Sequence, residues 1–161
     1  MITDKPTLER INKLHPKIRK EVTDTILRIQ DKGVELRIVQ GLRTFAEQDA
    51  LYAQGRTKPG AKVTNAIAGK SWHNYGLSFD FCLVHKDGKI SWNLSEDLDK
   101  DGKSDWLEVI ETFEMTGFES GIHWKFKDAP HLEKKFGLTI SQCLNKWNNK
   151  QVDQDGYILI K

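Results

Sequence analysis

The stretch SWHNYGLSFDFCLV, residues 71–84, joins a polar turn to a long apolar run. The apolar half has the length and the aromatic and aliphatic content of a buried strand. Gly76 stands between the two halves, where glycine permits a tight reversal of the chain. The stretch therefore predicts a buried strand that begins after a turn, with His73 in the turn and Asp80 in the strand.

Helices are expected mainly before this strand, and short strands after it. Periodicity and capping residues, among them Thr7 and Thr44 as N-caps, define the element boundaries. The expected elements are helices at 7–14 and 16–33, a strand at 34–41, a helix at 45–55, the buried strand, a hairpin partner at 89–92, a helix at 106–117, strands at 123–126 and 130–133, a helix at 139–149 and a terminal strand at 156–161. Short hairpin connections predict an α+β fold with a central antiparallel sheet flanked by helices.

Length and composition predict one domain, residues 1–161, in which residues 139–161 form a C-terminal helix and strand and are too few for a separate domain. The formal net charge of +2 does not favour nucleic-acid binding, although a mildly basic protein is still attracted to an anionic polymer such as a cell wall. Cys82 and Cys143 are far apart, which predicts neither a thiolate zinc site nor a disulfide scaffold. We expect no membrane segment, no nucleic-acid partner and a monomer.

His73 and Asp80 are the first candidates for a chemical role. A neutral imidazole and a carboxylate are common zinc ligands, but a catalytic zinc site needs three protein ligands and one open position. Two residues alone are equally consistent with a buried histidine that is hydrogen-bonded to a carboxylate. The pair by itself therefore leaves both interpretations open.

The segment DAPH offers a third ligand, because it places Asp128 three residues before His131. A carboxylate at that spacing is well placed to take a proton from a water molecule on a metal that His131 binds. This arrangement gives His73, Asp80 and His131 as metal ligands and Asp128 as the general base.

Arg43, in the segment GLRT at the end of a predicted strand, is a further candidate. Next to a glycine turn, its guanidinium is placed to enter a cleft, where it would bind a substrate carboxylate or stabilise the oxyanion of a tetrahedral intermediate. The alternative is a surface arginine in a salt bridge, which is the more common situation for an isolated arginine.

The motifs SxHxxGxxxD, DxPH and GxRT, in the chain order GxRT, SxHxxGxxxD, DxPH, closely resemble those of zinc peptidases of the D-alanyl-D-alanine carboxypeptidase/VanY type. Within that group the chain is most similar to L-alanyl-D-glutamate endopeptidases, which occur as bacteriophage endolysins and as bacterial wall enzymes. The resemblance runs from about Pro16 to the segment WKFKDAPHLEKKFGL and covers most of the chain. It implies a small α+β domain whose antiparallel sheet carries the zinc, a fold shared with Hedgehog-type domains.

The resemblance also implies roles for individual residues. The zinc ligands of the family correspond to His73, Asp80 and His131, the general base to Asp128, and the arginine that stabilises the transition state to Arg43. With these correspondences, a metal site is the favoured interpretation of His73 and Asp80.

Five further residues are expected near the substrate. Ser71 matches the serine of the family motif and either contacts substrate or orders the ligand loop, and Gln48 and Tyr75 match positions near the cleft. The chain has SGIHW where family members commonly have WGGDW, so that His123 replaces an aspartate beside the expected peptide groove. We expect His123 and Trp124 in the substrate groove, with a surface or packing role as the alternative for His123.

The acidic segment DLDKDGKSDWLE matches the calcium-loop pattern D-x-[DN]-x-[DN]-G-x5-E at every fixed position. Its candidate ligands are Asp97, Asp99, Asp101, Asp105 and Glu108. Oxygen ligands at alternate residues, followed by a closing glutamate, are what calcium binding requires. No clear helix precedes the loop and no second loop pairs with it, so the alternative is a solvated loop whose aspartates cap the following helix.

The expected function is hydrolysis of peptidoglycan stem peptides by a zinc-activated water, with the L-Ala–D-Glu bond as the expected target. A D-Ala–D-Ala carboxypeptidase or dipeptidase with the same site is the second interpretation, and a wall-binding module without catalysis is the third. Because the chain shows no apolar signal segment, we expect synthesis in the cytoplasm and action on the cell wall after release through a phage-type membrane pore or export by another route.

Overall fold

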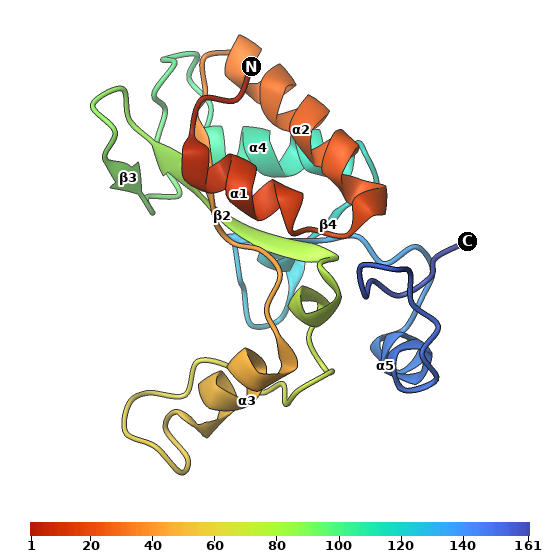
Figure 1. Cartoon of the computed structure of the whole chain (residues 1–161). Helices are drawn as coiled ribbons and strands as arrows, with labels where there is room; N and C mark the ends of the chain where they lie inside the picture. The colour runs from red at the N-terminus through yellow and green to blue at the C-terminus, as the bar shows by residue number, and fades with distance from the viewer.

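The computed structural model describes all residues from 1 to 161 and contains a five-stranded antiparallel sheet (Figure 1). Its central strand is β2, Ser78–Val84, which is the strand predicted from the apolar run. β2 pairs with β1 (Leu36–Gln40) on one side and with β5 (His131–Glu133) on the other. The short strand β3 (Ile90–Ser91) extends the hairpin after β2, and β4 (Glu119–Ser120) borders β5.

The helices lie in two groups around this sheet (Figure 1). α1 (Lys5–Asn12), α2 (Pro16–Asp31) and α4 (Asp105–Glu114) lie near one another, with α1 against β1 and α2 against α4. α3 (Phe45–Ala53) and α5 (Ile140–Asn148) lie toward the opposite end of the molecule. The result is the predicted α+β fold, a central antiparallel sheet flanked by helices.

The alternation of side chains along β2 separates the core from the site. Phe79 and Phe81 share one face of the strand and pack on α4, with ring centroids 5.2 Å apart for Phe79 and Phe113 and 4.6 Å apart for Phe81 and Trp106. Asp80 lies between these two aromatic residues and therefore points to the opposite face of the sheet. The strand is buried along most of its length, and Asp80 is only half-buried.

Three local predictions are wrong. The first helix is capped by Asp4, whose carboxylate accepts hydrogen bonds from Thr7, so that Thr7 lies inside the helix and is not its N-cap. The segment 123–126 is not a strand, because the chain forms a single 3-10 turn at Gly121–His123 and then an exposed loop. Its alternating aromatic residues resemble a strand in sequence, but β5 pairs with β2 on one side and with the preceding β4 on the other, which leaves no place beside it for this segment.

The third error concerns the C-terminus, where residues 156–161 were expected to form a strand. Its only β-pairing is one isolated antiparallel bridge, between Val152 and Ile158. Asp153 holds the turn between them by accepting from the backbone amides of Asp155 and Tyr157. Ile158 is buried in the core, so this residue serves packing and not sheet formation. None of the helices has both the length and the apolar character that crossing a bilayer requires.

Gly76 has the left-handed conformation that the predicted turn requires, with φ of 66° and ψ of 20°. An added Cβ would lie 2.7 Å from the backbone nitrogen of His15, which itself donates to the Gly76 carbonyl. The turn therefore needs glycine both for its dihedral angles and for the close approach of another segment.

Gly76→Ala is expected to lower the free energy of unfolding by about 3 kcal/mol, because it combines dihedral strain with a backbone clash. Gly88→Ala is the matched control, since Gly88 has a φ of 84° but no atom within 4 Å of the added Cβ. That variant should lose about 1 kcal/mol from dihedral strain alone. Urea unfolding of the two variants measures the difference, and equal losses would contradict the role of the close approach.

Candidate metal and active site

Three predicted ligands, distant in the sequence, come together on one face of the sheet. His73 lies in the 3-10 turn Trp72–Tyr75, which Gly76 closes and which leads back into β2. Asp80 in β2 is the register partner of His131 at the start of β5. One ligand atom from each of the three residues lies within 4.8 Å of the others. The fold thus builds a His/Asp/His cluster that fits a metal ion.

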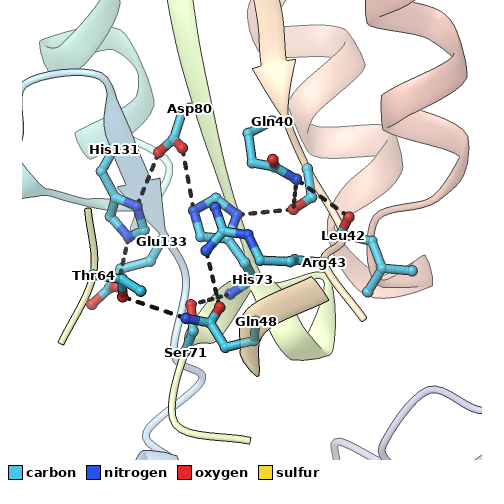
Figure 2. A network of polar contacts seen from close by, with 11 residues as sticks. Gln40, Leu42, Arg43, Gln48, Thr64, Ser71, His73, Asp80, His131 and Glu133 are labelled. Carbon is cyan, nitrogen blue, oxygen red and sulfur yellow. Dashed lines mark hydrogen bonds and ion pairs between the residues drawn. The ribbon is translucent and has the colours of Figure 1, made fainter. Parts of the chain in front are cut away.

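Asp80 stands between the two imidazoles (Figure 2). Its Oδ2 lies 3.4 Å from Nε2 of His73, and its Oδ1 lies 3.1 Å from Nδ1 of His131. The other ring nitrogens are held from outside the cluster, because Nδ1 of His73 contacts the Gly41 carbonyl at 2.8 Å and Nε2 of His131 contacts Glu133 at 2.8 Å. Each imidazole therefore has one nitrogen fixed by an acceptor and the other directed at Asp80, which is the arrangement of metal-binding histidines.

The contacts within the cluster stabilise the charged forms of Asp80 and His131. Burial alone would raise the pKa of the Asp80 carboxyl, but its contacts with His131 and His73 hold that pKa well below its usual range. For His131, burial lowers the pKa, yet the contacts with Asp80 and Glu133 outweigh burial and raise it to about 9. Without a metal, the His131 imidazolium therefore neutralises part of the carboxylate charge. A bound cation would replace that proton, because histidine coordinates metals in its neutral form.

Glu133 belongs to this cluster, although the motifs did not single it out. It is buried, with an exposed fraction of 2%, and it also contacts Nζ of Lys135 at 3.2 Å. The signal that would have found it is its spacing, because side chains two residues apart on a strand share one face. A metal-binding imidazole also needs an acceptor for its second nitrogen. Glu133 thus orients His131.

Glu133→Gln is expected to weaken zinc binding by about tenfold, because the amide keeps the size of the side chain but loses the charge that fixes the His131 ring. Glu119→Gln is the matched control, since Glu119 contacts the same Lys135 at 2.6 Å from the neighbouring strand but does not touch the cluster. Competition with a chromophoric chelator measures both zinc affinities. Equal affinities in the two variants would contradict the orienting role.

Arg43 is held beside the cluster by its own backbone. Its amide donates to the His73 carbonyl at 3.0 Å, and its carbonyl accepts from the Asn74 side chain at 3.0 Å. Nη1 of Arg43 donates to Oε1 of Gln48 at 3.0 Å (Figure 2), while its buried Nε has no partner. Burial lowers the pKa of Arg43, and Asp80 partly offsets this effect, but a guanidinium stays charged at neutral pH. The half-buried cation thus keeps an N–H free for a further acceptor.

Asp128 follows the 3-10 turn at Gly121–His123 and precedes β5. Its amide donates to the Gly121 carbonyl at 2.9 Å, and its carbonyl accepts from the His131 amide at 3.1 Å. Asp128 is exposed as a residue, but the protein atoms around its carboxyl partly desolvate it and raise its pKa, and the charge of Asp80 adds to the increase. An added Cβ on Gly121 would lie 2.4 Å from the Asp128 carbonyl oxygen, so this glycine permits the close packing that places Asp128.

Comparison with known proteins identifies the family of the chain. The family described as VanY, D-alanyl-D-alanine carboxypeptidase, matches residues 11–129. The chain belongs to the VanY family. The matched region contains Arg43, His73, Asp80 and Asp128, and it ends two residues before His131.

Two relatives of this VanY-family protein carry more specific names. The chain is 50% identical over 121 residues, 74% of its own length and 72% of the relative's, to the peptidoglycan L-alanyl-D-glutamate endopeptidase CwlK of Bacillus subtilis (strain 168). In three dimensions it is similar to the L-Ala D-Glu endopeptidase ChiX of Serratia marcescens. That match has a TM-score of 0.58 at 19% identity and covers 82% of this chain and 88% of the other. The structural match supports the α+β fold.

Several residues expected near the substrate are buried in this VanY-family fold. Gln48 has an exposed fraction of 0% and donates to the Ala66 carbonyl at 2.7 Å while it holds Arg43. Tyr75 is also buried, and its hydroxyl donates to the Gly69 carbonyl at 2.8 Å. Both side chains therefore stabilise the site from inside the protein.

Ser71 is the N-cap of the turn that carries His73. Its Oγ accepts from the His73 amide at 3.3 Å, and its own amide is bound by the side chain of Asn74, which completes a capping box. Of the two roles considered for Ser71, these contacts favour ordering of the ligand loop.

His123 and Trp124 are adjacent in sequence but differ in position. The Trp124 ring lies 5.0 Å from the His131 ring and is partly exposed, so it borders the cluster. His123 is exposed and contacts Glu114 of α4 at 2.7 Å. The structure therefore brings Trp124 to the site and directs His123 toward α4.

The acidic loop predicted to bind calcium lies apart from this cluster, before α4. Asp97, Asp99 and Asp101 have ligand atoms within 4.8 Å of one another, and Asp99, Asp105 and Glu108 form a second group by the same criterion. Burial raises the pKa of Asp105 and Glu108, and the neighbouring aspartates add to both increases.

Proposed function

We propose that this VanY-family protein is a zinc peptidase that cleaves the L-Ala–D-Glu bond in the stem peptides of peptidoglycan. The observation that carries the proposal is the 50% identity to an L-alanyl-D-glutamate endopeptidase over 74% of the chain. The His73, Asp80 and His131 cluster supports the zinc, and the family supports the peptidase chemistry.

The donor set fits zinc better than the hard cations. Two imidazole nitrogens and one carboxylate oxygen are typical ligands of catalytic zinc, whereas calcium and magnesium prefer ligand sets made of oxygen alone. Three protein ligands leave one position for water and substrate. When bound by these three residues, zinc would supply Lewis-acid chemistry for activating a water molecule and polarising the substrate carbonyl.

Asp128 has the properties that the general base requires. Its pKa is raised by partial desolvation and by Asp80, and its carboxylate has no hydrogen-bond partner in the protein. It is therefore free to accept the proton of the attacking water and to return it to the amine that leaves when the peptide bond breaks. The position of Asp128 three residues before His131 keeps this carboxylate beside the cluster.

Arg43 has the properties needed to stabilise the oxyanion of the transition state. Gln48 and the backbone contacts with His73 and Asn74 fix its position before substrate binds, so little reorganisation is needed during the reaction. An open hollow of about 470 Å³, lined by residues of β1, the following turn and α3, reaches Arg43 from the surface. Trp124, beside His131, is proposed as one wall of the peptide groove.

A second candidate function follows from the description of the family, which is that of D-alanyl-D-alanine carboxypeptidases. The same cluster would serve either activity, because endo- and carboxypeptidases differ in what closes the end of the groove. The two reactions release different products from one substrate, so that the products identify the bond.

Digestion of purified muropeptides by the zinc-loaded protein, followed by mass spectrometry, tests the proposal. We expect free stem peptides that begin with D-Glu, and zinc at one equivalent per chain in the same sample. Release of the terminal D-Ala alone would replace the endopeptidase by the carboxypeptidase. Intact muropeptides in the presence of bound zinc would contradict both.

A further inference from the structure

The loop before α4 concentrates negative charge on a short segment. Between β3 and the first turn of α4 (Figure 1), one loop and one helix end bring together the carboxylates of Asp97, Asp99, Asp101, Asp105 and Glu108. Asp99 belongs to both groups of close ligand atoms, so the five side chains form one continuous cluster. Like charges at these distances repel one another unless a cation lies between them.

Asp105 and Glu108 each have one buried carboxylate oxygen without a hydrogen-bond partner. Asp105 has an exposed fraction of 0%, and its Oδ2 accepts from the Leu98 amide at 2.8 Å, but its Oδ1 has no hydrogen-bond partner. Oε2 of Glu108 is likewise buried and unpartnered. Buried carboxylate oxygens are unfavourable unless a donor or a cation satisfies them. Lys103 does not satisfy them, because its ammonium contacts Asp101 at 3.7 Å and is exposed.

Capping of the helix does not account for the cluster. The N-cap of α4 is Ser104, whose Oγ accepts from the Leu107 amide at 3.4 Å. The oxygens of Asp97 instead accept from the amides of Asp101 and Gly102, at 3.1 Å each, and so hold the loop itself in shape. The N-cap of α4 is therefore a serine and not an aspartate, although Asp105 and Glu108 do lie in the first turn of the helix.

We propose that residues 97–108 bind one calcium ion through these five carboxylates. Oxygens on one calcium ion, each 2.3–2.6 Å from it, are at most about 5 Å apart. The ligand atoms of Asp97, Asp99 and Asp101 lie within 4.8 Å of one another, and so do those of Asp99, Asp105 and Glu108, so one ion would draw the two groups together around Asp99. The unpartnered oxygens of Asp105 and Glu108 would complete the coordination from the helix. Calcium fits better than magnesium, because magnesium keeps several waters and binds few carboxylates directly.

The ion would link the loop to the core of the sheet. Trp106 follows Asp105 directly and packs on Phe81 of β2, so a cation that holds Asp105 also holds this contact. Binding to the folded state alone raises stability, whereas repulsion among the empty carboxylates lowers it. The inference is separate from the proposed peptidase function, since its readout is binding and stability.

The test is calorimetric titration of the zinc-loaded protein with calcium chloride in calcium-free buffer, together with thermal unfolding. We expect one calcium per chain and, at a hundredfold excess over the dissociation constant, a rise in Tm of about 5–10 °C. Magnesium chloride at the same concentration should shift Tm by less than half as much. No calcium heat and no shift, or an equal shift with magnesium, would overturn the proposal.

The variant Glu108→Gln tests whether Glu108 is a calcium ligand or only supports the structure of the helix. We expect this variant to bind calcium more than about tenfold more weakly, and to unfold at the same or a higher temperature than the parent protein in the absence of calcium, because one repelling charge is gone. Glu111→Gln is the matched control, an exposed glutamate one turn later in the same helix, and it should bind calcium like the parent. Unchanged calcium affinity in Glu108→Gln would overturn the assignment, as would equal weakening in both variants.

Discussion

Asp128→Asn is expected to lower kcat about a thousandfold while one zinc per chain stays bound. Asparagine keeps the size of the side chain and the backbone contacts with Gly121 and His131, but it cannot accept the proton of the attacking water. Loss of a general base typically costs between about a hundredfold and ten-thousandfold in rate. Hydrolysis of muropeptides and zinc analysis of the same sample measure both quantities.

Asp87→Asn is the control for this experiment, because Asp87 is an exposed carboxylate in the turn between β2 and β3. That variant should hydrolyse the substrate at the parent rate. Full activity of Asp128→Asn would remove Asp128 from the reaction. Loss of zinc from the same variant would instead assign Asp128 a place among the metal ligands.

His131→Ala is expected to abolish both zinc binding and activity. The substitution removes one of the three ligands and leaves the buried carboxylate of Glu133 facing an empty space, without the imidazole that now contacts it at 2.8 Å. Since changes to the outer contacts of a metal ligand cost about 10- to 100-fold in affinity, loss of the ligand itself should cost more than about 100-fold. Zinc affinity and muropeptide hydrolysis are the measurements.

His123→Ala provides the matched histidine for comparison. His123 is exposed and contacts Glu114, so its loss should leave the zinc affinity unchanged. If His131→Ala kept zinc with parent affinity, or if His123→Ala lost zinc to the same extent, the ligand assignment would be wrong.

Much of the fold was predictable because its elements carry strong local signals. The apolar run of β2, the capping box that starts at Thr44 and the glycine turn at Gly76 each leave the chain few local alternatives. The errors occur where local pattern and tertiary pairing disagree. The alternating residues after His123 and the apolar residues around Ile158 resemble strands, but neither segment obtains a partner along its length.

Site residues that lie in spaced motifs could be predicted from the sequence. The roles of residues outside those motifs were harder to predict. Glu133 is adjacent to a recognised motif, yet its role depends on which nitrogen of His131 faces Asp80. Likewise, Gln48 and Tyr75 were expected at the substrate, but their amide and hydroxyl groups bind backbone carbonyls inside the protein. Hydrogen bonds to distant segments of the chain decide such roles, and the spacing of residues in the sequence does not reveal those partners.

By itself, the sequence predicted the metal ligands and their places on turns and strands. Residue type and spacing singled out His73, Asp80 and His131, because metal chemistry restricts the ligands to a few side chains, and the resemblance to the zinc peptidases made the metal site the favoured interpretation. Only the tertiary structure decided that Asp80 faces His131 across two paired strands, with Glu133 behind the ring and Gln48 behind Arg43. The physical reason is that strand register and burial, which are properties of the folded chain as a whole, set the direction of each side chain.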